Sequence, residues 1–388
     1  MAGQVGSRRS PLSFAGPQPI RLFRLFGIQF TASWIWLLFF ALLIYIAFAM
    51  FATLRLGFSR VELWSLAVIA AVLSVFSLYA HELAHALVAR AFGIPVRTIS
   101  LFLLGGMTHI TRESPSPRAE FLIAVVGPLC NTLLGILGLV AWLVFGFSPA
   151  LAVLGLWMAY MNLPLGIFNL VPAFPLDGGR VLRGVLWYAG GDVGWASTTA
   201  ARVGQVAAVG LLFSGVWSVF EGGEDAFGGL WLIVIAWFMY AGATSSQYAS
   251  AFQEALRRLT VASVMDRDFR RVQAGLSVQA FAEEHLLEKP GVASPSARHA
   301  YAVYRDEYVI GLLSLEQLGH IPMHSWPQTS IERAMLPIEA APAMEPSAPA
   351  LGALHLILEE GVELVAVMAE GRLLGLITRN ELARAGAK

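Results

Sequence analysis

An apolar run over residues 65–91 carries His81, Glu82 and His85 close together. About 20 consecutive apolar residues are enough to cross a bilayer as an α-helix, so this run predicts a transmembrane helix. Ionisable side chains at membrane depth are costly, and for this reason most of them belong to functional sites. The chain is therefore constrained to fold within a membrane and to keep a polar site inside one of its helices.

The three side chains form the pattern H-E-x-x-H, which indicates a metal-dependent hydrolase. Residues four apart lie on one face of a helix, so His81 and His85 can direct ring nitrogens at one zinc ion while Glu82 stands beside them as general base. The alternative to a metal site is a pair of histidines at the membrane interface with a glutamate that extends toward water. A catalytic zinc site normally takes three protein ligands, so a third ligand must come from elsewhere.

Composition indicates a membrane part followed by a soluble part. Hydrophobic residues make up 57% of the chain and charged residues 13%, against about 25% charged residues in soluble domains. Residues 260–388 hold 11 Arg or Lys and 16 Asp or Glu, whereas the longer segment 1–259 holds 15 and 10. We expect six transmembrane helices, near residues 32–54, 65–91, 119–145, 150–171, 203–220 and 229–250.

Arginine is distributed unevenly across this six-span topology. Only Arg55 and Arg60 fall on one side, and the arginines on the other side are Arg8, Arg9, Arg21, Arg24, Arg90, Arg97, Arg112, Arg118, Arg180, Arg183, Arg202, Arg257 and Arg258. Because cytoplasmic loops are rich in Arg and Lys, this asymmetry predicts a multi-pass protein of the inner (plasma) membrane with both termini in the cytoplasm. Neither half carries a basic patch that would suggest a nucleic-acid partner.

The third metal ligand is expected to be Asp177, which lies in the segment Asn169-Leu-Val-Pro172-Ala-Phe-Pro-Leu-Asp177-Gly-Gly. The prolines and glycines break the fourth apolar run, and irregular backbone at membrane depth is tolerated only where it is buried in protein or lines a wet cavity. The carboxylates of Asp177 and Glu82 would also balance the charge of a zinc ion. The alternative is that Asp177 caps a helix with Arg180 as its partner.

These two motifs resemble those of the site-2 protease family, the intramembrane metalloproteases, over residues 20 to about 250. The resemblance implies that His81, His85 and Asp177 bind Zn²⁺ and that Glu82 is the catalytic base. It also implies that Asn169 holds the substrate backbone or the oxyanion; the alternative is that Asn169 pairs with carbonyls freed by Pro172. The segment around Gly105 and Gly106 looks like the family's membrane-re-entrant loop.

Two similar halves follow in residues 260–388, each ending in a Ser or Thr after an apolar strand. They resemble a tandem of cystathionine-β-synthase (CBS) domains, which often bind adenine nucleotides through an Asp three residues after the Ser or Thr. Here the residue three positions after Ser314 is Gln317, which puts the nucleotide site of the first half in doubt. The residue three positions after Thr378 is Glu381, which keeps a carboxylate. The resemblance implies nucleotide contacts at Ser314, Thr378 and Glu381; the alternative is a structural pair that forms a homodimer.

The sequence thus predicts a polytopic α-helical membrane protein with a C-terminal α/β CBS pair. The expected divisions are a cytoplasmic arm (1–30), an intramembrane metalloprotease domain (31–252) and a regulatory domain (260–388). The expected function is zinc-dependent cleavage of single-span or membrane-tethered proteins in the bilayer, such as anti-sigma or pro-sigma factors. The alternative from another class is a transporter or channel gated by CBS domains, since intramembrane charges also mark ion paths.

Overall fold

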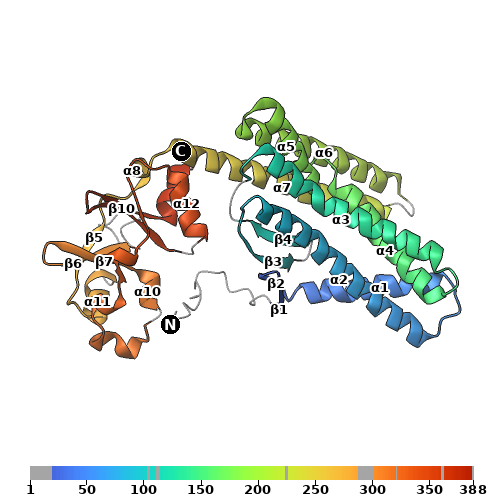
Figure 1. The fold of residues 1–388 in the computed structure, drawn as a ribbon, viewed down its shortest axis with the longest axis horizontal. Coiled ribbons are helices and arrows are strands. Elements are labelled where there is room, and N and C mark those ends of the chain that lie inside the picture. Colours follow the sequence, from blue (N-terminus) through green and yellow to red (C-terminus); the bar gives the residue numbers. More distant parts are fainter. Residues whose placement is uncertain are drawn as a thin grey trace. The chain divides into compact units, whose positions relative to one another are not determined.

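A computed structural model describes residues 20–102, 105–110, 114–222, 226–286, 300–319, 321–359 and 362–386, with backbone alone for 101–110. These residues divide into two compact units, one within Gly16–Ser250 and one within Ala251–Lys388 (Figure 1). The first unit is built mainly from long helices, and the second combines short helices with two small sheets.

Six helices of the described chain are long and apolar enough to cross a membrane, which confirms the six predicted spans. Their bounds are α1 (Trp36–Thr53), α2 (Arg60–Ala91), α3 (Pro117–Val144), α4 (Pro149–Asn169), α6 (Val193–Glu221) and α7 (Ala226–Arg258). Most of them begin earlier or end later than the apolar runs suggested, because polar residues continue the helix beyond its hydrophobic part. The capping box of Ser59 and Glu62, for example, starts α2 five residues before the predicted span.

Helices α3 and α4 approach each other closely through small residues. A Cβ atom on Gly138 would lie 2.8 Å from the Gly155 carbonyl oxygen, and one on Gly166 would lie 2.6 Å from the Thr132 hydroxyl oxygen. Without a hydrophobic driving force between helices in lipid, such close backbone packing provides much of their attraction. Helix α3 also packs against α2 and α5, so it is the central helix of the first unit.

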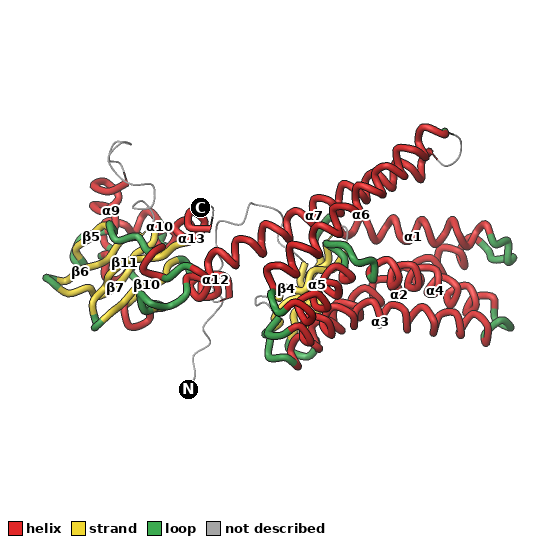
Figure 2. Tube along the Cα trace, turned by 90° about the horizontal axis from the view of Figure 1, so that it is seen from above, coloured by secondary structure: helices red, strands yellow, loops and turns green. Residues whose placement is uncertain are grey.

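A four-stranded sheet lies where α2 ends (Figures 1 and 2). Its strands follow the order β1 (Ile20–Leu25), β2 (Ile28–Ala32), β3 (Val96–Phe102) and β4 (Gly105–Ile110), with β2 parallel to β3 and the other pairs antiparallel. The segment expected to re-enter the membrane is therefore a hairpin, with residues 103–104 outside the described chain. Residues 20–30, which we expected in the N-terminal arm, form the other two strands.

The expected break after the fourth span is confirmed: residues 170–176 are not helical, and α5 (Asp177–Gly190) begins at the predicted ligand. Two glycines make this tight connection possible. A Cβ on Gly178 would lie 2.1 Å from the Val171 carbonyl oxygen, and one on Gly179 would lie 2.6 Å from the Phe174 nitrogen. Only glycine can approach another backbone segment so closely, so residues 170–176 pack directly against the first turn of α5.

The second unit consists of two halves with the same topology. In the first half, β5 (Arg270–Gln273) is parallel to β6 (Ala300–Arg305), which pairs with β7 (Tyr308–Ser314); in the second, β9 (Ala343–Met344) is parallel to β10 (Leu364–Ala369), which pairs with β11 (Arg372–Thr378). The remaining α-helices and strand are α8 (Val261–Val264), α9 (Val278–Phe281), α10 (Leu315–Gly319), α11 (Ile331–Ala334), β8 (Leu336–Pro337), α12 (Ala350–Glu359) and α13 (Arg379–Gly386), and three short helical turns of other types span Ala282–Leu286, Met323–Gln328 and Ile338–Ala340.

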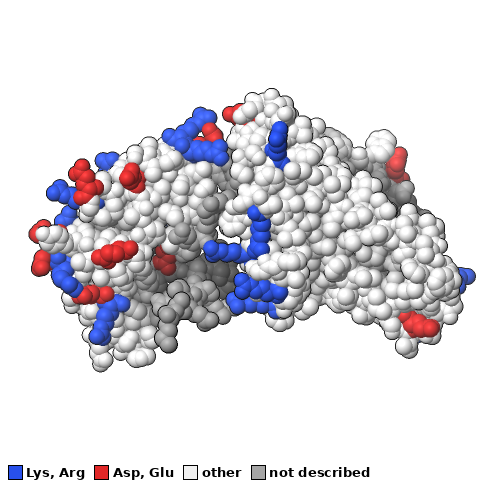
Figure 3. Space-filling view, in the orientation of Figure 1, with Lys and Arg blue, Asp and Glu red and all other residues white. Residues whose placement is uncertain are grey.

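The two halves exchange equivalent contacts. Met265, at the start of the first half, packs against Gly375 of the second half, in the space that a side chain there would fill. Met335, at the start of the second half, packs against Gly311 of the first half in the same way. The reciprocal contacts confirm the internal duplication predicted from sequence. Charged side chains are dense on the face of this unit in Figure 3 and sparse on the helices of the first unit, as the uneven composition requires.

Candidate metal centre

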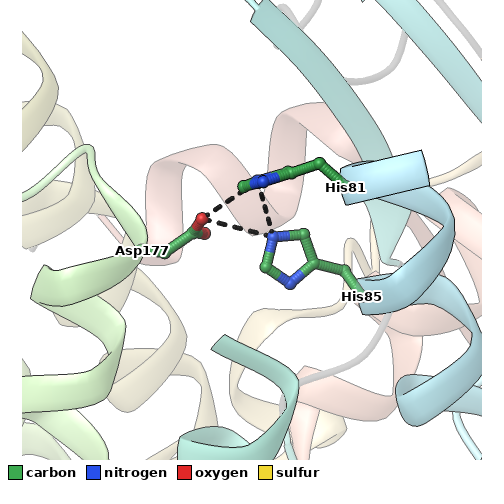
Figure 4. Close-up of side chains that lie close together, drawn as sticks. All are labelled: His81, His85 and Asp177. Atoms are coloured by element: carbon green, nitrogen blue, oxygen red, sulfur yellow. Dashed lines mark hydrogen bonds and ion pairs between the residues drawn. The ribbon is translucent and has the colours of Figure 1, made fainter. Parts of the chain in front are cut away.

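Helix α2 places the two histidines of the sequence motif one turn apart. His81 and His85 are 5% and 4% exposed, and their Nε2 atoms lie 3.1 Å from each other. Asp177 reaches both from the start of α5, with its Oδ2 atom 3.2 Å from each Nε2 atom (Figure 4). Two helices separated by more than 80 residues in sequence thus bring together a carboxylate oxygen and two imidazole nitrogens, a group that could hold a metal ion.

The spacing of these three atoms fits a zinc ion. Ligands about 2.0–2.1 Å from a tetrahedral zinc are separated from one another by about 3.3 Å, close to the separations seen here. The space beside them is kept open by Gly127 of α3, because a Cβ at that position would lie 2.2 Å from His85 Nε2 and 2.8 Å from His81 Cε1. The donor atoms and the missing side chain therefore leave a place that an ion can occupy.

The orientation of His85 is fixed by the backbone of α3. Its Nδ1 atom lies 2.5 Å from the carbonyl oxygen of Ile123, so Nδ1–H donates to that carbonyl and the lone pair of Nε2 is directed at the metal position. A hydrogen bond of this kind selects one tautomer and holds the ring. Ile123 and Gly127 lie one turn apart, so the same face of α3 both orients a ligand and leaves room for the ion.

Asp177 is a ligand candidate and not a helix cap. The N-cap residue of α5 is Leu176, and no side chain caps it. The Oδ2 atom of Asp177 instead faces the Nε2 atoms of both histidines, where the third ligand is needed. A carboxylate supplies the negative charge that suits a ligand of a divalent metal ion.

A buried ion cluster holds α5 against α3. Glu120 of α3 is fully buried. Its Oε1 atom accepts a hydrogen bond from the Nε atom of Arg180 at 3.1 Å, and its carboxylate also accepts from Arg183 and Ser114. Arg180 lies one turn after Asp177, so these bonds fix the turn that carries the third ligand. The alternative for Asp177 gave it Arg180 as its partner; the structure pairs Arg180 with Glu120 instead.

The two predicted catalytic residues are Glu82 and Asn169. Glu82 is 7% exposed and follows His81 directly on α2. Asn169 is the last residue of α4 and is partly buried, and the described residues offer its side chain no hydrogen bond. Neither residue is part of the group of three converging atoms.

The residues predicted to bind a nucleotide cap the N-termini of short helices in this structure. The backbone nitrogen of Ser314 donates to Gln317 Oε1 at 3.0 Å, and that of Thr378 donates to Glu381 Oε2 at 2.9 Å. Each pair resembles a capping box at the start of a short helix, α10 or α13. Ser314 also donates its hydroxyl to Glu363, whereas Glu381 is 7% exposed and its Oε1 atom has no partner in the described chain.

Three residues of α3 that contact or support the candidate ligands were not predicted from the sequence: Glu120, Ile123 and Gly127. Glu120 carried a usable signal, because a carboxylate inside an apolar run must find partners. The other two act through a backbone carbonyl and through the absence of a side chain. Such roles leave no trace in the residue type alone.

Comparison with known proteins identifies the family. The model of "Peptidase family M50" matches residues 68–155 and 147–213. A relative described as a zinc metalloprotease, Rip3 of Mycobacterium tuberculosis, is 34% identical over 84% of this chain and 82% of its own length. The structure titled "Site-2 Protease from Methanocaldococcus jannaschii" is 29% identical and covers 59% of this chain and 95% of its own, with a TM-score of 0.40.

A solved protein with CBS domains from Burkholderia ambifaria, 18% identical, covers 33% of this chain and 93% of its own, with a TM-score of 0.28. The relatives are metalloproteases, which sets aside the transporter or channel alternative. From the relationship to Rip3 and the family match we conclude that the chain belongs to peptidase family M50, the site-2 proteases, and is a zinc metalloendopeptidase.

Proposed function

We propose that the chain cleaves single-span or membrane-tethered proteins inside the bilayer, using zinc held by His81, His85 and Asp177. The observation that carries this proposal is the convergence of three donor atoms, two of them from α2, a helix apolar enough to span a membrane. Anti-sigma and pro-sigma factors are substrates of the expected kind, because they are tethered to the membrane and released by cleavage.

Glu82 handles protons in this proposal. Zinc, when bound, lowers the pKa of water and polarises the substrate carbonyl. Glu82 takes the proton of the attacking water and returns it to the leaving amine, a role open to it because it adjoins a ligand on α2 without belonging to the converging atoms. Asn169 holds the substrate backbone or the oxyanion from the end of α4, eight residues before Asp177.

The edge strand β4 offers a place to hold an extended substrate. It is the last strand of the sheet, and it packs against α2, the helix that carries the histidines. A transmembrane helix hides its carbonyls in its own hydrogen bonds, so a substrate must unwind before attack. Pairing with the free edge of β4 replaces the lost bonds.

The proposed location is the inner (plasma) membrane, with both termini and the opening of the active site on the cytoplasmic side. The arginine asymmetry supports this orientation. Cysteines introduced at Gly16 and Gly223 should label oppositely with an impermeant reagent applied outside, with Gly223 the reactive position. Labelling only at the Gly16 position would mean that the true topology is the inverse of the one proposed.

The C-terminal unit is proposed to regulate cleavage by binding an adenine nucleotide, with Glu381 on the ribose and with contacts from Thr378 and Ser314. The buried, unpartnered Oε1 atom of Glu381 supports a ligand at the second half. In the first half the Ser314 hydroxyl already donates to Glu363, which argues for a weaker site. We also propose that the CBS pair forms a homodimer.

The test is a comparison of membrane-protein fragments in cells that carry the wild-type chain or Glu82→Gln. Cleavage within the bilayer predicts that full-length or membrane-tethered precursors accumulate with Glu82→Gln and that shorter products disappear. Identical fragment patterns in the two strains would contradict the proposed function. The accumulated precursors would also name the substrate.

A further inference from the structure

Asn131 of α3 is a fully buried amide that the metal centre does not use. Its side chain is 0% exposed, and neither Nδ2 nor Oδ1 has a hydrogen-bond partner among the described residues. A buried amide that lacks both its donor and its acceptor partners is destabilising, since folding has removed it from water without replacement. Such a group calls for a ligand that supplies the missing bonds.

Asn131 lies one turn from the metal centre. Residues four apart share a helix face, so Asn131 stands on the face of α3 that presents Gly127 to His85 and His81. The helices α2 and α3 run antiparallel here, because Ile123 contacts His85 while Gly127 reaches back to His81. Asn131 is therefore about 6 Å further along α3 than the opening beside the ligands.

A peptide main chain is the ligand that this amide suits. An asparagine side chain offers an acceptor oxygen and two N–H donors, which match the N–H and C=O of a peptide unit. A substrate that unwinds inside the bilayer exposes those groups where no water is at hand, and each needs a partner. An extended peptide rises about 3.3 Å per residue, so 6 Å corresponds to about two residues from the bond at the metal.

We propose that Asn131 binds the main chain of the substrate about two residues from the scissile bond. The inference rests on the proposed function, because it presumes that an unwound peptide enters the site. Asn131 is a binding residue in addition to Asn169.

A second buried asparagine shows why Asn131 is singled out. Asn162 of α4 is also 0% exposed, but its Nδ2 atom donates to the Met158 carbonyl oxygen at 3.0 Å, within its own helix. Only its Oδ1 atom lacks a partner in the described chain. Asn162 thus has a local structural role, whereas Asn131 has no partner in the described chain for either atom and lies one helical turn from Gly127, which contacts the ligands.

The decisive variant is Asn131→Leu, which keeps the approximate shape and removes the amide. Removing an unpaired buried polar group should leave the melting temperature unchanged or raise it, and the zinc content per chain should not change. Binding of a substrate peptide should weaken about tenfold, the effect of one buried hydrogen bond. The matched control is Thr132→Val at the next position, whose hydroxyl donates to Pro128 and faces α4.

Binding is measured in the Glu82→Gln background, where the peptide is not cleaved. The probe is a labelled apolar peptide of about 20 residues with a central Gly-Ser pair, in detergent micelles. We expect Asn131→Leu to weaken its binding and Thr132→Val to leave it unchanged. In chains that keep Glu82, kcat/KM should fall by at least the same factor.

Three outcomes would overturn the inference. Unchanged binding and cleavage would remove Asn131 from the site. A lower melting temperature with parallel losses of zinc and binding would give it a structural role. Lost cleavage with intact binding would place it on the reacting atoms or on a bound water. Because the binding assay needs no cleavage, it decides this point even if the wild-type chain proves inactive, a result that would instead contradict the proposed function.

Discussion

The metal centre and the C-terminal unit satisfy their buried polar groups in opposite ways. At the metal centre, His81 and His85 of α2 meet Asp177 of α5, more than 80 residues away in sequence, and the three side chains point their donor atoms at one another. In the C-terminal unit, Thr378 and Glu381 are three residues apart and satisfy each other locally. Polar atoms that converge from far apart in sequence require a ligand between them. A local cap holds its helix end by itself and leaves only the Oε1 atom of Glu381 for a ligand.

The largest expected effect separates proton transfer from metal binding. Glu82→Gln should lower the cleavage rate by about 10²–10⁴-fold, because general base catalysis contributes that much, while zinc stays bound. Cleavage of a membrane substrate and zinc content are measured on the same purified sample. Undiminished cleavage would remove Glu82 from the mechanism and leave the centre without its assigned base.

Gly127→Ala tests whether the opening beside the ligands is needed for the metal. The new Cβ would overlap the His85 ring, and because side-chain atoms yield more readily than backbone, the ligands should move while the fold persists. Zinc affinity should fall by more than about 100-fold, the upper effect of residues that only orient ligands. Competition with a zinc chelator measures it.

The matched control for Gly127 is Gly210→Ala on α6, where a Cβ meets nothing within 4 Å. This change should leave zinc affinity as in the wild type. If Gly127→Ala bound zinc as tightly as Gly210→Ala, the metal position assigned here would be wrong.

Glu120→Gln probes the anchor of α5. Removing one partner of a buried ion cluster leaves Arg180 and Arg183 uncompensated and should cost about 3 kcal/mol of stability. Thermal unfolding with and without zinc measures the loss, and weaker zinc binding should accompany it because Asp177 lies on the same helix. Glu254→Gln on α7, whose carboxylate pairs with the exposed Arg258 at 3.0 Å, should change little. Equal effects of the two changes would rule out an anchoring role for Glu120.

The smallest expected effect lies in the C-terminal unit. Glu381→Ala removes the cap of α13 and should cost about 1 kcal/mol of stability. On our proposal it also weakens binding of AMP, ADP or ATP to the full chain, and Gln317→Ala does so less. Calorimetry measures both. If the wild-type chain binds none of these nucleotides at millimolar concentration, the unit is a docking or dimerisation element, and the metal centre is unaffected.

The comparison also shows what the sequence could reveal. The six spans, the three candidate ligands and the duplicated C-terminal unit each have a local pattern, whether an apolar run, a fixed spacing or a repeated strand. The hairpin of β1 and β2 and the helix α5 were not foreseen. The hairpin joins the sheet only through β3, and α5 packs against α3, so the partners that hold them in place lie far away in sequence. The contributions of Ile123 and Gly127 arise only from the contact of α3 with α2. A single sequence contains no signal for them.

The most direct test of the centre is the zinc content of Asp177→Ala beside that of the wild type and of Glu82→Gln. In our proposal Asp177 is the ligand that joins the two motifs, and its substitution leaves the histidines of α2 in place. Atomic absorption on purified protein should find one zinc per chain in the wild type and in Glu82→Gln, and almost none in Asp177→Ala. Full zinc occupancy in Asp177→Ala would contradict the three-ligand centre on which the proposed mechanism rests.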